Sequence, residues 1–436
     1  MENKKYDVAI IGGGPAGSTA ATLLSRSGIN CVVFEKEIFP RPHVGESLLP
    51  FCYDLFKELG VLEEVRSKSI PKPGVRFLDG NGDSYSNYCF SHYIKGPSAI
   101  SSHVDRAQFD KILLDNAKKN GVEVQEGTKV KSVAITSSDV KILASNDDGE
   151  KSYTADFLID ASGQNTFLAK RFKQKEKMTN LDRTAFSAHW HGGKMLDGLS
   201  EGIQQIAYVG EEKQGWIWVI PINENRLSIG VVLNSNYVKS QKSKFAGQEN
   251  WQEAFYREEL KLIPYAQKIL AESTLASPVN LNGNYSYTVT KKYGARYALI
   301  GDSGTFIDPI FATGVYLAMK SSFLVSKSII ESKKNNSNEI NLDSTYRSIN
   351  GAYALIERLI RQYYNPKAIN FHELDGHFEK TDSALGIMHH ILAGDFFDKY
   401  EQYDAFLTKL ENEKHFARYK NLVFEKNDLE GISCKH

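Results

Sequence analysis

The stretch YDVAIIGGGPAGSTAATLLSRSGINCVVFEK, residues 6–36, decides the fold of this chain of 436 residues. Residues 6–11 are a short apolar run rich in β-branched side chains, which is typical of a buried parallel strand. Residues 18–28 have a helical pattern that ends at Gly28, and residues 31–36 predict a second buried strand. The stretch therefore predicts a strand–helix–strand unit at the start of an α/β fold.

The turn between this strand and this helix carries the pattern G-x-G-x-x-G. Gly12 allows a tight turn, Gly14 lets the backbone approach a pyrophosphate, and Gly17 lets the helix pack on the strand. The helix N-terminus then offers free N–H groups to phosphates. Glu35 closes the second strand, where its carboxylate can accept both hydroxyls of a ribose. The pattern thus predicts a dinucleotide site, and the alternative is a glycine-rich turn without a ligand.

Similar elements recur further along the chain. A helical period with a glycine stop covers residues 103–121, buried strands end at 163 and 304, and a long helix covers 314–330. Between residues 184 and 235, alternating strands predict an inserted antiparallel sheet, and the C-terminal part has a helical pattern. We expect a discontinuous binding domain in 1–70, 100–165 and 290–330, a sheet domain in 71–99 and 166–289, and a helical region in 331–436.

Composition limits the class of protein. Apolar residues make up 41% of the chain, and Lys+Arg and Asp+Glu are both 53, which does not suggest a nucleic-acid binder. There is no signal peptide and no apolar run long enough for a membrane span, so we expect a cytoplasmic enzyme. None of the four cysteines forms a C-x-x-C pair, so we expect neither a metal site nor a disulfide framework, as in a reducing compartment.

Three later segments are similar to the FAD motifs of the aromatic-hydroxylase-like flavoprotein superfamily: VDRAQFD around Arg106, FLIDASG (157–163) and ALIGDSG around Asp302. The resemblance implies that the dinucleotide is FAD, that Asp302 holds its ribityl chain and that Gly301 lets the backbone come close. Asp302 could instead cap the next turn, because Asp is a common turn residue. There is no second G-x-G-x-x-G, which argues against a dedicated NAD(P)H domain.

A narrower resemblance rests on four further segments. They are FPRPHVGESLLP (39–50), IPKPGVRF (70–77), WIWVIP (216–221) and DSGTFIDPIFATGVYLA (302–318). Together they resemble the flavin-dependent halogenases, whose signature W-x-W-x-I-P is intact here, and the resemblance extends from residue 6 to about residue 400. In that family reduced FAD, O2 and halide give hypohalous acid, which reaches a lysine through an interior passage and then halogenates an electron-rich ring.

The resemblance implies catalytic roles for four residues. Lys72 lies in the segment that matches the family's lysine, and its alternative is a solvated loop lysine, because lysines are seldom buried. Trp216 and Trp218 share one face of a strand and would line the passage, although ordinary core packing explains them equally well. Glu46 would handle a proton, or would form a structural hydrogen bond with nearby backbone.

The resemblance also implies binding roles. Halide would bind backbone N–H groups at Thr313 and Gly314, where a helix begins and favours an anion. The local sequence F-A-T-G lacks the serine that many relatives have, which leaves a related monooxygenase or dehydrogenase open as the alternative activity. The remaining expected cofactor contacts are Ala16, Lys36, Arg41, Ser47 and Arg106, beside Gly12, Gly14, Gly17, Glu35, Asp302, Thr313 and Gly314.

The sequence therefore predicts an FAD-dependent halogenase of a phenol- or pyrrole-type substrate, free or bound to a carrier protein. The implied partner is a separate flavin reductase that supplies reduced FAD. A third hypothesis is a non-enzymatic flavin-binding protein. Such a protein would have no use for a passage lined by tryptophans or for the lysine, since fold alone does not fix function.

Overall fold

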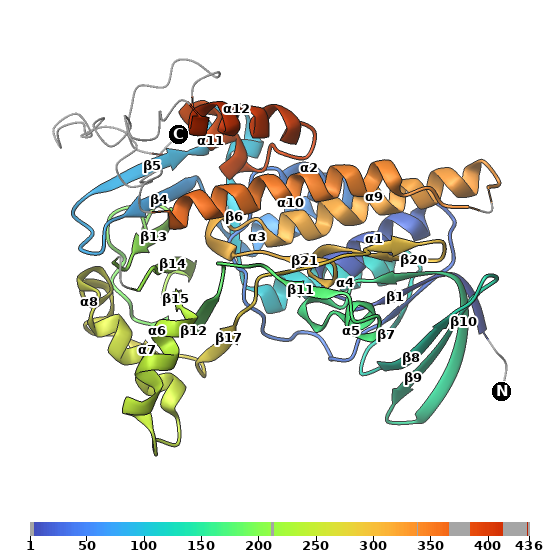
Figure 1. The fold of residues 1–436 in the computed structure, drawn as a ribbon, viewed down its shortest axis with the longest axis horizontal. Helices are drawn as coiled ribbons and strands as arrows, with labels where there is room; N and C mark the ends of the chain where they lie inside the picture. Colours follow the sequence, from blue (N-terminus) through green and yellow to red (C-terminus); the bar gives the residue numbers. More distant parts are fainter. Residues whose placement is uncertain (1–3, 211–212, 338, 366–383, 413–433, 435–436) are drawn as a thin grey trace.

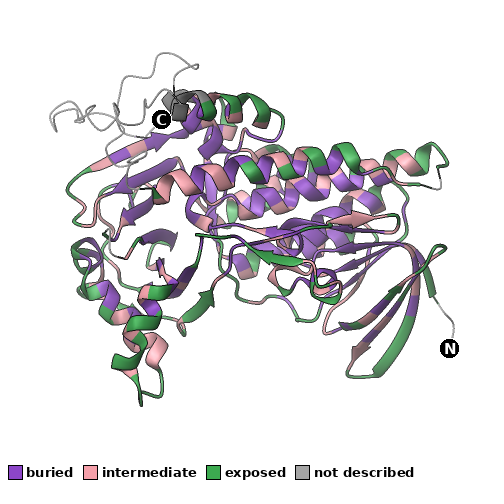
Figure 2. Cartoon of the chain, viewed as in Figure 1, coloured by how far each residue is buried: buried purple, intermediate pink, exposed green. Residues whose placement is uncertain are grey.

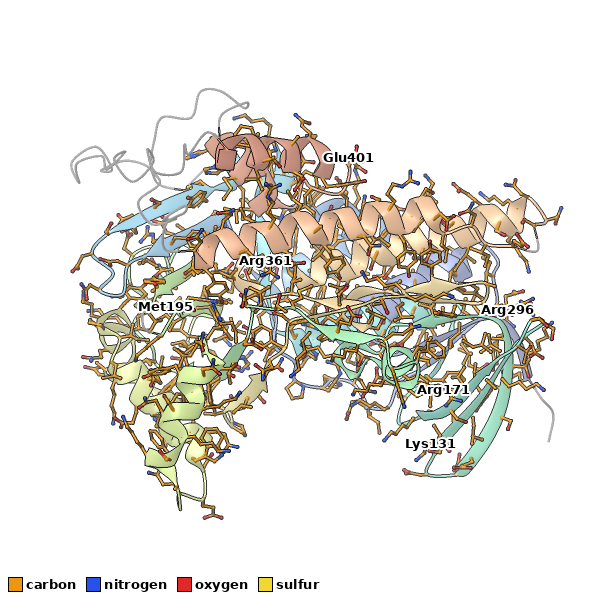
Figure 3. All side chains as sticks on the ribbon, viewed as in Figure 1. Lys131, Arg171, Met195, Arg296, Arg361 and Glu401 are labelled. Carbon is orange, nitrogen blue, oxygen red and sulfur yellow. A yellow bond between two sulfur atoms is a disulfide. The ribbon has the colours of Figure 1, made fainter. Side chains whose placement is uncertain are left out.

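The structure is a computed structural model that describes residues 4–210, 213–337, 339–365, 384–412 and residue 434. Two large sheets and a layer of long helices make up the described chain (Figure 1). Buried residues follow the sheets and the inner faces of the helices (Figure 2). Charged side chains such as Lys131, Arg171 and Glu401 lie exposed at the periphery (Figure 3).

The first sheet is built on β1 (Lys4–Ile11), which is parallel to β2 (Cys31–Phe34) on one side and to β10 (Gly149–Asp160) on the other. Its side chains are buried on both faces, as the near-continuous apolar run predicts. The sheet order is β19-β20-β10-β1-β2-β7, with an antiparallel extension of β8 and β9 beside β10. The added strands are β7 (Glu123–Gln125), β8 (Lys129–Ile135), β9 (Val140–Asn146), β19 (Tyr293–Gly294) and β20 (Tyr297–Leu299).

Helices cover this sheet. The helix α1 (Pro15–Arg26) buries a row of small residues, so α4 (Arg106–Lys119) and α9 (Gly314–Lys334) pack closely against it. Ser322 of α9 donates a hydrogen bond of 2.9 Å to the carbonyl of Ala16. The amphipathic α10 (Asp343–Tyr364) packs on α9 and α12. The other helices of this part are α2 (Cys52–Leu59), α3 (Leu62–Ser67), α5 (Phe167–Arg171), α11 (Ala384–Ala393) and α12 (Tyr400–Asn412).

The second sheet has the order β16-β12-β15-β14-β13-β4-β5, and β17 pairs with β12. Alternate residues of β14 (Trp216–Asn223) face two different cores. Its tryptophans pack in the core that includes α9 and α10, and Ile217 and Val219 pack in a second core on the opposite face of the sheet. Its other strands are β4 (Gly74–Leu78), β5 (Tyr85–Cys89), β12 (Arg183–His191), β13 (Gln204–Tyr208), β15 (Arg226–Asn234), β16 (Thr274–Leu275) and β17 (Asn280–Gly283).

The prediction of an antiparallel sheet is wrong for one pair, because β4 runs parallel to β13. Residues 235–270 also hold three helices that the alternating pattern does not predict: α6 (Ser235–Gln241), α7 (Trp251–Lys261) and α8 (Pro264–Leu270). Asn250 caps α7 by accepting the N–H of Glu253, a local signal that the strand pattern obscures. These helices cover the outer face of the second sheet.

Two small sheets connect the layers. The strand β3 (Ser69–Lys72) pairs with β6 (Ser101–Val104), and both pack against β14. The other contains β11 (Lys175–Lys177), β18 (Tyr287–Val289) and β21 (Thr305–Phe306). Among the described residues, no helix is long and apolar enough to cross a membrane.

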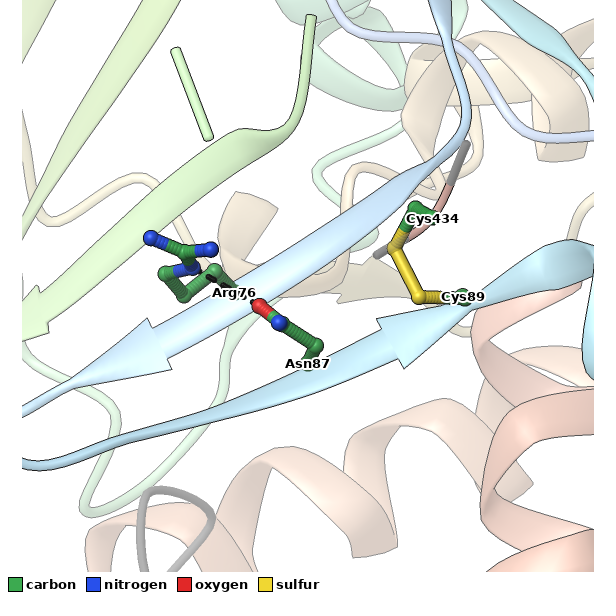
Figure 4. The surroundings of a disulfide bond; sticks show 4 residues. All are labelled: Arg76, Asn87, Cys89 and Cys434. Carbon is green, nitrogen blue, oxygen red and sulfur yellow. Dashed lines mark hydrogen bonds between the residues drawn. A yellow bond between two sulfur atoms is a disulfide. The ribbon is translucent and has the colours of Figure 1, made fainter. Parts of the chain in front are cut away.

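One disulfide corrects the expectation drawn from the cysteines. Cys89, at the end of β5, is bonded to Cys434, with a Cα–Cα distance of 5.3 Å (Figure 4). Arg76 and Asn87 form a hydrogen bond of 2.7 Å between β4 and β5 nearby. The two cysteines are 345 residues apart, so no spacing motif reveals the pair.

Candidate functional site

The glycine-rich turn between β1 and α1 has the shape of a dinucleotide cradle. Gly12 has φ +102°, and a Cβ there would lie 2.4 Å from the carbonyl oxygen of Ala161. A Cβ on Gly17 would lie 1.9 Å from the carbonyl oxygen of Gly12, so the helix can pack this closely only with glycine. A Cβ on Gly14 would meet one neighbour within 4 Å, Nη2 of Arg41 at 3.6 Å, and α1 begins at the next residue, so its first-turn N–H groups lie at this turn. This geometry fits a pyrophosphate.

Glu35 sits at the end of β2 and is buried. Its two carboxylate oxygens accept the backbone N–H groups of Gly13, at 2.7 Å, and Glu37, at 2.8 Å. Each oxygen retains a further lone pair, so Glu35 can fix the turn and still accept a ribose hydroxyl. Lys36 lies exposed next to it, with its ammonium 3.3 Å from Glu37.

Arg41 and Arg106 lie together beside this turn. Asp110 is fully buried and accepts two hydrogen bonds from Arg106, at 2.8 and 2.9 Å, and one from Arg41, at 3.0 Å. Arg41 also stacks on Phe39, and its Nη2 lies 3.6 Å from the position of a Cβ on Gly14. The two expected cofactor residues are therefore held as a cationic pair at the mouth of the cradle.

Asp302 lies at the carboxyl end of β20, just after Gly301, which has φ +58°. Burial raises the pKa of Asp302 to about 7, and Arg106 only partly offsets this effect. Within the described residues, no hydrogen bond reaches its carboxylate, so it does not act as a turn cap. A partly exposed carboxylate close enough to Arg106 to feel its charge fits the hydroxyl groups of a ribityl chain.

The segment expected to bind halide begins the long helix α9. Ala312 has φ +55°, and this sharp bend directs Thr313 and Gly314 into the start of the helix. Thr313 is buried, while a Cβ on Gly314 would meet nothing within 4 Å. A helix of 21 residues therefore begins beside open space at Gly314, and a helix start of this kind suits an anion.

Lys72 lies at the end of β3 and is 1% exposed, which rules out a solvated loop lysine. Its ammonium donates to the carbonyl oxygen of Leu48 at 3.0 Å and lies 5.5 Å from the ring centre of Phe90. In the part of the chain that the structure describes, no carboxylate forms an ion pair with it. Burial lowers the pKa of Lys72 to about 7, so amine and ammonium are both accessible near neutral pH.

Trp216 and Trp218 share one face of β14, as the two-residue spacing predicts, with ring centres 5.7 Å apart. The indole N–H of Trp218 donates to Ser228 on β15 at 3.1 Å. Gly230, also on β15, leaves the space that the ring of Trp218 fills. Both indoles are fixed, which suits the lining of a passage and ordinary core packing equally.

A buried carboxylate that the sequence analysis missed lies beyond Trp216. The indole N–H of Trp216 donates to the hydroxyl of Tyr364 at 2.8 Å, and Tyr364 donates to Asp308 at 2.8 Å. Tyr285 donates to the same oxygen at 2.9 Å. Asp308 therefore links β14 and α10 to the segment that leads to Gly314. The Asp-Pro pair at 308–309 is the one local signal for it.

Glu46 reaches across to the second sheet. It is 3% exposed, and its carboxylate contacts the Nε2 of His189 at 2.6 Å and accepts from the hydroxyl of Ser228 at 2.9 Å. The alternative of a side-chain hydrogen bond to nearby backbone is therefore wrong, because both partners are distant side chains. The neighbouring Ser47 donates to Gln204 at 2.8 Å. His189 and Ser228 were missed; polar residues in otherwise apolar strands were the available signal.

Comparisons with known proteins agree with this geometry. A family model described as "FAD binding domain" matches residues 5–354. A 1H-pyrrole-2-carbonyl-[peptidyl-carrier protein] chlorinase from Pseudomonas fluorescens is 32% identical over 359 residues, 77% of this chain and 78% of the relative. A tryptophan 2-halogenase from Chondromyces crocatus is 33% identical over 327 residues, 74% of this chain and 60% of the relative.

Two solved structures extend the comparison. A flavoprotein/dehydrogenase from Cytophaga hutchinsonii has a TM-score of 0.81 and 25% identity, covering 96% of this chain and 98% of that structure. The myxobacterial chondrochloren halogenase CndH has a TM-score of 0.74 and 25% identity, covering 91% of this chain and 89% of that structure. The cradle, the signature strand and the buried lysine thus occur here on a backbone that these proteins share.

Proposed function

This chain belongs to the flavin-dependent halogenases, and from that premise we propose that Lys72 directs hypohalous acid onto a phenol- or pyrrole-type ring. The enzyme uses reduced FAD, O2 and a halide. The observation that carries the proposal is the burial of Lys72 on a strand that packs against the tryptophan-bearing β14, with no carboxylate partner among the residues that the structure describes. A cation in that position has no evident structural purpose.

The proposed cofactor site follows the glycine cradle. Gly12, Gly14 and Gly17 admit the pyrophosphate, Glu35 accepts a ribose, and Asp302 accepts the ribityl hydroxyls. The chemistry that FAD supplies when bound in its reduced form is the reduction of O2, which converts halide into hypohalous acid. The further proposed contacts are Ala16, Lys36, Arg41, Ser47 and Arg106.

The chain's own residues then hold the halide and the hypohalous acid and exclude water. Backbone N–H groups at Thr313 and Gly314 hold the halide. The indoles of Trp216 and Trp218 keep water out of the interior, where an electrophilic halogen would otherwise be lost. Lys72 holds hypohalous acid by a hydrogen bond from Nζ, and its pKa of about 7 allows that proton to be given or withheld near neutral pH.

The proposed substrate is a pyrrole-type ring on a carrier protein, and the proposed partner is a flavin reductase. The chlorinase relative is named for a pyrrole carried on a peptidyl carrier protein, which supports a pyrrole-type substrate on a carrier. A separate flavin reductase supplies reduced FAD here, because the sequence holds one G-x-G-x-x-G and no second dinucleotide site of that kind.

The test separates oxidant formation from halogen transfer. Wild-type protein and Lys72→Ala would be supplied with FAD, an unrelated flavin reductase and bromide, with free phenols and carrier-bound pyrrole as substrates. Brominated product would be measured by mass spectrometry, and released hypobromous acid by a trapping reagent. We expect Lys72→Ala to lose about 100-fold or more of the product and to keep releasing oxidant.

The control is Lys68→Ala, because Lys68 is exposed and pairs with Glu64, four residues earlier, on the surface. It should brominate like the wild type. Product formation by Lys72→Ala at the wild-type rate would overturn the role of Lys72. A product that gains oxygen from O2 and no bromine would identify a monooxygenase instead.

A further inference from the structure

Halogenation by the proposed reaction consumes one proton in each turnover. Reduced FAD, O2, one halide ion, one proton and the aromatic C–H substrate give oxidised FAD, the aryl halide and two water molecules. The halide enters as an anion and leaves covalently bonded, so one proton must enter the interior in each turnover. The inference below rests on the proposed function and concerns the route of that proton.

The Glu46 network has the geometry of such a route. Ser228 is 2% exposed, Glu46 is 3% exposed, and the side chain of His189 is 26% exposed. Glu46 contacts Nε2 of His189 at 2.6 Å and accepts from Ser228 at 2.9 Å, and Ser228 in turn accepts from Trp218, so the partly exposed imidazole is bonded directly to a buried carboxylate beside Trp218. Imidazole and carboxylate are groups that exchange protons near neutral pH.

The surroundings hold these groups in place. The backbone of Glu46 accepts from Val104 at 2.8 Å, and the backbone N–H of His189 donates to Ser277 at 2.9 Å. Charged groups face the network from both layers. Arg106 of α4 acts on Glu46, and His189 acts on Asp105, which is itself paired with Arg226 of β15.

We propose that His189 and Glu46 form a proton relay from solvent to the halogenation site, with Ser228 as the residue that positions Glu46. Nδ1 of His189 takes a proton from solvent, which makes the ring an imidazolium. The N–H bond at Nε2 then breaks as an O–H bond forms on Glu46, and the ring is left neutral with its proton on Nδ1. Glu46 gives its proton to the oxygen that leaves as water, and rotation of the ring turns its N–H to Glu46 again. No further oxidant or reductant is required.

The variants separate proton transfer from hydrogen bonding. His189→Gln keeps a polar side chain but cannot carry a proton, and His189→Ala leaves a partly exposed gap that added imidazole can enter. We expect each to lower the rate of halogenation about tenfold or more, with a steeper loss towards alkaline pH, where solvent protons are scarce. Imidazole should restore His189→Ala several-fold and leave His189→Gln unchanged.

His191→Gln is the matched control, because His191 lies exposed on the same strand and its ring contacts the backbone carbonyl of Asn225 at 3.3 Å. Two readouts do not depend on turnover. FAD affinity, from flavin fluorescence, should match the wild type in both His189 variants. In protein without FAD, Glu46→Gln should shift the NMR signals of the His189 ring and not those of His191.

Three outcomes would overturn the relay: wild-type rates in His189→Gln across the pH range, no rescue of His189→Ala by imidazole, or loss of FAD binding in both variants. Absence of halogenated product from the wild type would count against the proposed function. The NMR coupling between Glu46 and His189 tests their pairing even in that case, so the two failures are distinguishable.

Discussion

At Lys72 the folded chain buries an ammonium group against one carbonyl oxygen and a phenyl ring. The unfolded chain keeps this proton up to about pH 10.5, whereas the folded chain releases it above about pH 7. Between these values the unfolded state binds more protons, so stability rises with pH. Below pH 7 the full cost of the buried charge opposes folding. Proteins keep destabilising groups of this kind where activity requires them.

We therefore expect Lys72→Met to stabilise the protein while it abolishes halogen transfer. The gain in the free energy of unfolding should be on the order of a few kcal/mol at neutral pH and should shrink as the pH approaches 10.5. Denaturant unfolding at several pH values measures it, with exposed Lys68→Met as the control. A gain that does not change with pH would contradict the assigned burial of charge.

Single residues were predicted unevenly from the sequence. The lysine segment and the tryptophan spacing identified candidates, but burial of Lys72 depends on tertiary packing, and residue type alone favours exposure. The partners of Glu46 lie 143 and 182 positions away along the chain, so no local pattern indicates them. The roles of the candidate residues stay predictions.

At the level of elements, Gly230 and Trp218 form a fitted pair on neighbouring strands. A Cβ on Gly230 would lie 2.1 Å from the indole of Trp218, so Gly230→Ala must displace the ring. We expect a loss of about 1–3 kcal/mol in stability and a changed tryptophan fluorescence. Gly283→Ala, on exposed β17 with no close contact, is the control and should change neither property. An unchanged spectrum in Gly230→Ala would show that the strand pair adapts elsewhere.

Elements with a strong local period were predicted well. The strand–helix–strand unit, the helix that begins at Gly314 and the three strands β13, β14 and β15 all occur, because buried runs, alternation and glycine stops are local signals. The parallel pairing of β4 with β13 was missed, since β4 precedes its partner by more than a hundred residues and hydrophobic pattern does not specify direction.

For the whole molecule, the α/β class was predictable because the FAD motifs lie at the ends of strands of the first sheet. The family was predictable because W-x-W-x-I-P and the lysine segment are each contiguous in the sequence. The division into domains stays a prediction. No sequence motif indicates which residues form the contacts between the first layer and the second sheet. Glu46 and Ser47 from the first layer contact His189, Ser228 and Gln204 of the second sheet, and these contacts join the cofactor cradle to the tryptophan strand.

The bond between Cys89 and Cys434 also changes the topology of the chain. It closes a ring that contains most of the polypeptide. Without a reductant, the unfolded protein is therefore a cross-linked loop and not a linear chain. Such a loop has a smaller hydrodynamic radius. In denaturing electrophoresis, we expect oxidised protein to migrate faster than reduced protein, and Cys89→Ser to migrate like the reduced form under both conditions. Equal mobility of oxidised and reduced wild type would show that the ring is open.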